Sequence, residues 1–66
     1  MKAYRAKEVT PLLASDAQLM QLWKEAAGED AIVAFQKNGE NWVGVRDAAL
    51  AAMLEARGLK GEPWNG

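Results

Sequence analysis

Side chains that commonly carry out catalysis are scarce in this sequence. It has no Cys and no His, and Thr10 and Ser15 are its only aliphatic hydroxyls. A Ser/His/Asp or Cys/His set therefore cannot be assembled, and a zinc site is nearly excluded because its usual ligands are missing. Glu25 and Glu29 offer paired carboxylates, but no pocket-forming pattern accompanies them. We expect no enzyme activity, no cofactor, no bound metal and no small-molecule substrate.

The size and charge of the chain are those of a small binding module. Half of its 66 residues are apolar and 26% are charged, a globular composition for one small domain. The net charge of −1 predicts no bulk attraction to nucleic acid or to anionic membranes. The longest apolar run, Ala48 to Leu54, is too short to span a bilayer, and Met1 to Arg5 is not followed by the apolar stretch of a signal peptide. We expect a cytoplasmic protein without a membrane partner.

The clearest structural signal is a β-hairpin. The strand-like segments Ile32 to Gln36 and Asn41 to Val45 flank Asn38-Gly39, which favours a type I′ turn because both central residues of that turn need positive φ. The turn predicts four cross-strand pairs: Phe35 with Trp42, Val33 with Gly44, Ile32 with Val45 and Ala34 with Val43. Both faces of this ribbon are apolar, so we expect either helices on both sides or one side kept for a partner.

An amphipathic helix is predicted in front of the hairpin, from about Asp16 to Ala27. Ser15 with Gln18 three residues later fits a capping box, which places Ser15 at the N-cap. Gly28 is placed to end the helix in a left-handed conformation.

The residues before this helix allow two interpretations. A helix can start at Thr10-Pro11 and run on into the next one. Alternatively, a short separate helix from about Lys7 to Leu13 comes first, joined by a tight turn through Ala14 and Ser15. The polar segment Met1 to Glu8 is an extended arm or the lead into a helix.

A further helix is predicted from about Asp47 to Arg57, with Gly58 just past its end. The tail, residues 59–66, holds too many breakers for regular structure, and Trp64, its only anchor, either folds back on the core or waits for a partner. One helix or two short ones, then a hairpin, then a helix indicates an α+β domain over residues 1–58. The predicted core consists of Leu12, Leu19, Trp23, Val33, Phe35, Trp42, Leu50 and Met53.

The segment Lys7 to Trp23 has an early Glu-Val pair, two adjacent leucines, a small turn residue and a helix that ends near a Trp. In this it resembles the opening of the winged helix-turn-helix domains of phage excisionases and MerR-like regulators. The hairpin and the helix after it take the places of that family's wing and following helix, so the resemblance covers about Tyr4 to Gly58. It implies a winged helix-turn-helix-like fold and a small phage or mobile-element protein that binds DNA as an excisionase-like factor or transcription regulator.

The resemblance also implies which residues meet DNA, with a helix N-terminus in the major groove and the hairpin wing on the backbone. They are Ala17, Gln18, Gln21, Lys24, Lys37, Asn38 and Arg46. Gln pairs bidentately with adenine, and the Lys and Arg side chains meet phosphate. The sequence departs from the family pattern at Asp16, whose carboxylate we expect to face DNA and repel it. A dimer or a DNA-bound partner would then have to supply further affinity.

The same layout over about Ser15 to Gly58 also resembles the small W-type head–tail joining proteins of tailed phages, whose first strand and turn look like Ile32 to Gly39. This second resemblance implies assembly into a connector ring without catalysis. Two apolar hairpin faces and a net charge near zero equally suit an inhibitor or adaptor of another macromolecule. For these alternatives, contacts to another protein or to a second copy would involve Ile32, Val43 and Trp64.

Overall fold

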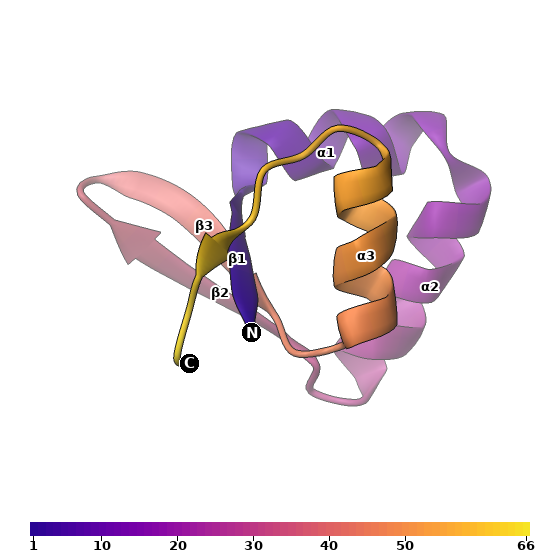
Figure 1. Cartoon of the computed structure of the whole chain (residues 1–66). Helices are drawn as coiled ribbons and strands as arrows, with labels where there is room; N and C mark the ends of the chain where they lie inside the picture. The colour runs from indigo at the N-terminus through magenta and orange to yellow at the C-terminus, as the bar shows by residue number, and fades with distance from the viewer.

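The computed structural model describes residues 1–66 and combines three helices with a four-stranded antiparallel sheet (Figure 1). In chain order the elements are β1 (Lys2–Arg5), α1 (Ala6–Ser15), α2 (Ala17–Gly28), β2 (Ile32–Lys37), β3 (Glu40–Val45), α3 (Ala48–Ala56) and β4 (Glu62–Pro63). The strands lie in the order β2-β3-β1-β4. The α+β class predicted from the sequence is confirmed. No helix has both the length and the apolar character needed to cross a membrane.

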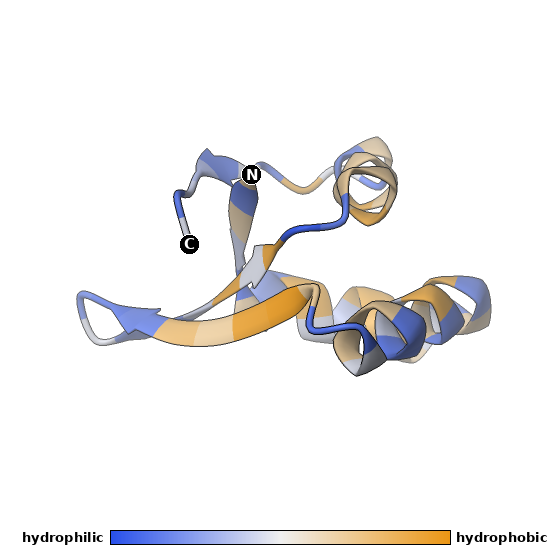
Figure 2. Ribbon diagram, turned by 90° about the horizontal axis from the view of Figure 1, so that it is seen from below, coloured by the Kyte–Doolittle hydropathy of each residue, from blue (hydrophilic) through white to orange (hydrophobic).

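The β2–β3 hairpin has the predicted register. All four expected pairs are present: Phe35 with Trp42, Val33 with Gly44, Ile32 with Val45 and Ala34 with Val43. Asn38 and Gly39 have φ values of 53° and 77°, the left-handed conformations that a type I′ turn requires. The tip of the hairpin projects away from the helices (Figure 2).

The N-terminal segment is a strand, and α1 begins directly after it at Ala6. β1 pairs with β3, where Tyr4 lies opposite Val43. Tyr4 is only 1% exposed, and its hydroxyl donates a hydrogen bond to the Glu55 carboxylate at 2.7 Å. Burial raises the pKa of Tyr4 well above its usual range, and Glu55 raises it further, so the phenol stays protonated. Tyr4 therefore anchors the N-terminal strand in the core.

α1 and α2 meet at a single residue, Asp16, so the interpretation with a separate first helix is confirmed, but Ala14 and Ser15 belong to α1 and do not form the expected turn. Asp16 ends α1 and caps α2, where its carboxylate accepts the backbone N–H of Leu19 at 3.0 Å. Ser15, the expected N-cap, is instead the last residue of α1, and its hydroxyl donates to the Leu12 carbonyl at 3.2 Å. The capping-box prediction is thus wrong by one residue, because the adjacent Asp is itself a good N-cap and adds a negative charge at the positive end of the helix. Pro11 lies in the second turn of α1.

The last helix agrees with its prediction to within one residue at each end. Asp47 is the N-cap of α3 and accepts the Leu50 N–H at 3.0 Å, while Arg57 is the C-cap. Gly58 follows with a φ of 98°, the left-handed conformation expected for it.

The end of α2 differs from its prediction. Gly28 is the last helical residue, and the left-handed position belongs to Asp30, with a φ of 58°. The N–H of Ala31 donates to the Ala26 carbonyl at 2.8 Å, which closes the helix end. Asp tolerates this conformation better than most residues, so the left-handed residue that follows the helix end lies two residues beyond Gly28.

The core lies between the sheet and the helices. It consists of Tyr4, Val9, Leu19, Ala26, Val45, Leu50, Ala51 and Leu54. Of the predicted core residues, Leu19, Trp42 and Leu50 are buried. The other five are only half-buried: Leu12, Trp23, Val33, Phe35 and Met53. Three of these five, the ones on helices, pack at the rim of the core.

The face of the sheet opposite the helices is covered by the C-terminal tail, which is not wholly irregular because Glu62–Pro63 forms β4 beside β1. The ring of Trp64 stacks on that of Phe35, with centroids 5.7 Å apart and planes inclined by 3°. It also lies against Gly44, where an added Cβ would overlap the ring. Trp64 therefore folds back on the chain, and the tail closes the second apolar face of the hairpin.

Candidate nucleic-acid interface

α2 presents the residues expected to read DNA on one side of the helix. All four are exposed: Ala17, Gln18, Gln21 and Lys24. Spacings of three and four residues bring them together, while Leu19 and Ala26 on the other side are buried. The Gln21 amide donates to the Glu25 carboxylate at 3.3 Å, and Lys24 takes part in no ion pair. This side of α2 offers amide groups, one unpaired ammonium and the exposed Glu25 carboxylate.

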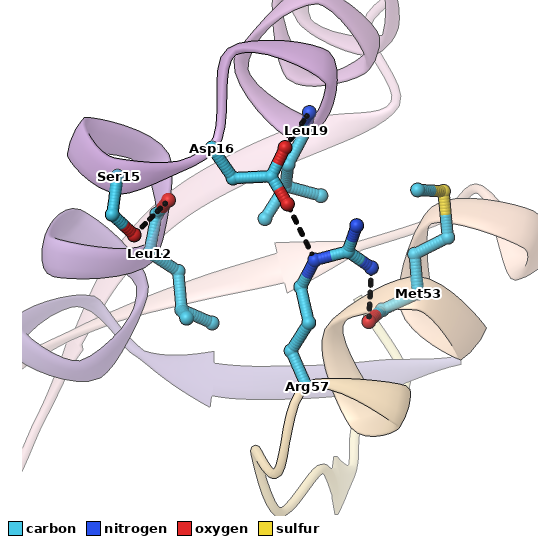
Figure 3. A network of polar contacts seen from close by, with 6 residues as sticks. All are labelled: Leu12, Ser15, Asp16, Leu19, Met53 and Arg57. Carbon is cyan, nitrogen blue, oxygen red and sulfur yellow. Dashed lines mark hydrogen bonds and ion pairs between the residues drawn. The ribbon is translucent and has the colours of Figure 1, made fainter.

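Asp16 is held within the chain by two partners, as Figure 3 shows. One carboxylate oxygen accepts the Leu19 N–H, and the other accepts the Nε–H of Arg57 at 2.7 Å. Arg57 is itself oriented by its Nη1, which donates to the Met53 carbonyl at 3.3 Å. The Leu19 N–H and the Arg57 guanidinium hold the pKa of Asp16 below its usual value. The expectation that this carboxylate faces a DNA ligand is therefore corrected: it is directed toward α3 and its charge is compensated.

The hairpin tip carries the other residues expected at the DNA backbone. Lys37 is exposed, but its ammonium lies 3.7 Å from the Glu62 carboxylate and 5.4 Å from the centre of the Trp42 ring. Asn38 is exposed at the turn. The tip thus holds one cation with a weak internal partner and one free amide.

The Arg46 side chain contacts other groups of the same chain. Its guanidinium donates to the carbonyls of Asp30, at 3.3 Å, and Gly66, at 2.7 Å, and lies 5.7 Å from the centre of the Trp64 ring. These contacts tie the base of the hairpin to the C-terminal tail. Sequence reasoning placed Arg46 near DNA and gave no sign of this bracing role.

Most cations already have an anionic partner within the chain. Five of the eight Lys and Arg side chains form ion pairs: Lys2, Arg5, Lys7, Lys37 and Arg57. Lys24, Arg46 and Lys60 form none. Exposed pairs of this kind are each worth about 0–1 kcal/mol, so they can open when a stronger partner arrives. They nevertheless leave the surface without a continuous basic face.

The three residues expected to contact a protein do not meet in one patch. Ile32 and Val43 are half-buried and pack against the core on the helix-covered face. Trp64 lies on the opposite face, against Phe35. An exposed apolar hairpin face with Trp64 beside it is therefore not formed.

Two hollows have Trp42 in their lining. One, of about 260 Å³, is lined by Arg5, Trp42 and Lys60 among others, and the Arg5 guanidinium lies 5.6 Å from the centre of the Trp42 ring. The other, of about 470 Å³, lies beside the outer half of the hairpin, where Ala34 and Val43 line it. Neither joins α2 to the hairpin tip. No group of three or more acidic side chains is placed to hold a metal ion.

Comparisons with protein-family models, with curated proteins and with solved structures find no match. The functional proposal therefore depends on the chain's own residues. The contact between Arg57 and Asp16 was not predicted from the sequence. Asp16 caps the start of α2 and Arg57 the end of α3, and these helices are far apart in the chain.

Proposed function

We propose that the chain is a winged helix-turn-helix module that binds duplex DNA, with α2 in the major groove and the β2–β3 tip on the phosphate backbone. The observation that supports the proposal most directly is the bonding of Asp16, the residue between α1 and α2. Because its carboxylate is bound by the Leu19 N–H and by Arg57, the start of α2 can approach a polyanion without a free negative charge. A ligand would then meet Gln18 and Gln21 first.

The exposed side of α2 has the chemistry of base recognition. A Gln amide offers a donor and an acceptor together, which matches the N6 and N7 edge of adenine. The hydrogen bond between Gln21 and Glu25 is exposed, so it can be exchanged for a base edge. Lys24, one turn further along, would contact phosphate, as would Lys37 once its 3.7 Å pair with Glu62 opens.

The proposed complex is weak for an isolated domain. Two or three phosphate contacts predict a plot of log affinity against log salt with a slope of only about −2 to −3. A physiological role would therefore be that of an accessory or regulatory factor in a DNA transaction, acting together with further protein contacts.

Fluorescence anisotropy with a randomised duplex pool at low salt tests the proposal, and Lys24→Ala and Lys60→Ala form a matched pair of variants. Both remove a cation without an ion pair, but only Lys24 lies on α2. We expect Lys24→Ala to weaken binding several-fold and Lys60→Ala to leave it nearly unchanged. Equal losses would indicate diffuse attraction, and no binding at tens of micromolar protein would end the proposal.

Base reading is tested separately by sequencing the duplexes that the protein retains. The wild-type chain should enrich adenine at one or two positions, and Gln21→Ala should relax that preference by about 1–3 kcal/mol at one of them. Gln36→Ala, on the hairpin, is the control for loss of a surface amide. An unchanged preference in Gln21→Ala would remove α2 from the interface.

A second function, binding of another protein, is favoured by the internal pairing of the cations and by the 470 Å³ apolar hollow at Ala34 and Val43. It predicts defined oligomers or co-purification with a large assembly, as expected for a joining protein or an adaptor. A chain that stays monomeric in light scattering and retains no partner would count against it.

A further inference from the structure

The two edges of the sheet differ in their protection. One edge is β4, only two residues long, and it contains Pro63. The other is β2, with six residues, no Pro and apolar or uncharged side chains up to Lys37. Short edge strands and proline are devices that prevent strand pairing, and β2 has neither.

The unpaired backbone groups of β2 can be identified from the ladder. The Arg46 N–H donates to the Ala31 carbonyl, so with the observed register the alternate residues of β2 direct their groups toward β3. The residues between them, Ile32, Ala34 and Gln36, direct N–H and C=O outward. Ala34, in the middle, is exposed and small enough to admit a second strand.

We propose that β2 pairs antiparallel with β2 of a second copy of this chain, about a two-fold axis at Ala34. In this register Ala34 lies opposite its own counterpart and Ile32 lies opposite Gln36. All three outward-facing residues are then paired, with about six hydrogen bonds between the copies. On the tail-covered face, each half-buried Val33 meets Phe35 of the other copy.

Charge along the strand selects an antiparallel copy as the occupant. A cation, Lys37, stands at one end of β2, and the carboxylates of Glu29 and Asp30 precede the other end without any ion pair. Antiparallel pairing brings Lys37 of each copy next to Ala31 of the other and so beside these carboxylates. A parallel copy would place like charges together.

The layers of the fold also fit this arrangement. The helices lie at the base of the hairpin and leave its outer half free (Figure 2). That outer half carries the 470 Å³ apolar hollow at Ala34 and Val43. The two-fold axis places each uncovered outer half beside the helix-covered base of the other copy. A six-residue strand pair is at the low end of interface sizes, so we expect a dimer that forms between micromolar and millimolar concentration.

Sedimentation combined with amide hydrogen exchange on the whole chain, without DNA, tests this pairing. The dimer fraction should rise with concentration, and protection of the Ala34 amide should rise with it, while the inward-facing Val33 amide stays protected throughout. A chain that is monomeric at millimolar concentration would leave β2 to a strand of another protein and overturn the proposal. A dimer with an unprotected Ala34 amide would overturn it as well.

Three variants separate strand pairing from a loss of folding. Ala34→Pro removes an outward N–H and should raise the dimer dissociation constant at least about tenfold, since the β2–β3 ladder does not use that donor. Lys37→Glu should weaken the dimer, and adding Glu29→Lys should restore it. The two positions lie at opposite ends of β2 in one chain, so a rescue requires contact between copies, and absence of rescue contradicts the register.

Discussion

The helix-covered face of the sheet buries Tyr4 and Val45 to 1% exposure, whereas the tail-covered face buries Trp42 to 6% and leaves Phe35 and Trp64 half-exposed. The first face is closed by aliphatic side chains from three helices. The second is closed by one stacked Trp and by cations that lie over aromatic rings. In a domain this small, only one face can be given a deep core, and the other depends on a few large rings.

The largest expected effect is a cavity on the helix-covered face. Leu54 is fully buried, so Leu54→Ala should cost about 2–5 kcal/mol, enough to leave a domain of this size largely unfolded. Leu59→Ala, at a half-buried position at the rim, should cost clearly less. Urea unfolding followed by circular dichroism measures both, and equal losses would mean that the two sites are buried alike.

The tail-covered face is tested by adding a single methyl group. Gly44→Ala should displace Trp64 and cost about 1–3 kcal/mol, because the new Cβ would overlap its ring. Trp64→Ala should cost a similar amount, and the double variant no more than either single one. Gly28→Ala is the control, since nothing lies within 4 Å of a Cβ added there. Additive losses would show that Trp64 does not lie on Gly44.

Acid should weaken the helix-covered face. The Leu19 N–H and Arg57 lower the pKa of Asp16 from 3.8, and the Tyr4 hydroxyl and Lys2 lower the pKa of Glu55 from 4.5. The unfolded chain regains the ordinary values and binds more protons, so stability is complete above about pH 5 and falls as the pH drops through the lowered pKa values.

Variants assign this acid sensitivity to its carboxylates. Asp16→Asn and Glu55→Gln should each flatten the loss of stability between neutral and acid pH. Trp64→Ala should lower stability without changing that slope. The melting temperature recorded at several pH values gives the slope, and a wild-type slope in both carboxylate variants would place the acid-sensitive groups elsewhere.

The smallest effect concerns the ion pair at the hairpin tip. Lys37 and Glu62 lie 3.7 Å apart and are each about half exposed, so Glu62→Gln should cost less than about 0.5 kcal/mol. Thermal unfolding at low and high salt measures it. A larger loss would mean that the tip, and not only Trp64, holds the tail in place.

The sequence was sufficient where the structure depends on local conformation. The Asn38-Gly39 turn predicts the whole β2–β3 register, because a two-residue turn leaves no freedom in strand pairing. Gly58 and the acidic and basic ends of α3 likewise locate that helix. In the candidate site, the exposed side of α2 was predictable from helical spacing alone.

The parts that could not be predicted depend on contacts between distant residues. β1 has only four residues, and its strand conformation results from pairing with β3 some forty residues later. The capping role of Asp16 was not predicted because Ser15 fits the local capping pattern, and the contact of Asp16 with Arg57 joins elements that are far apart in the chain. The contact between Trp64 and Gly44 cannot be predicted from local sequence. The lack of a side chain at Gly44 does not indicate which residue packs there.

The sheet order has a consequence for how a nascent chain folds. β1 leaves the ribosome first, yet its partners are β3 and β4, so it stays unpaired while most of the domain is synthesised. The hairpin, by contrast, can close within microseconds of its emergence. Pulse-labelled exchange during refolding should therefore show the amides of β3 that face β2 protected before those of β1, and simultaneous protection would indicate one concerted collapse.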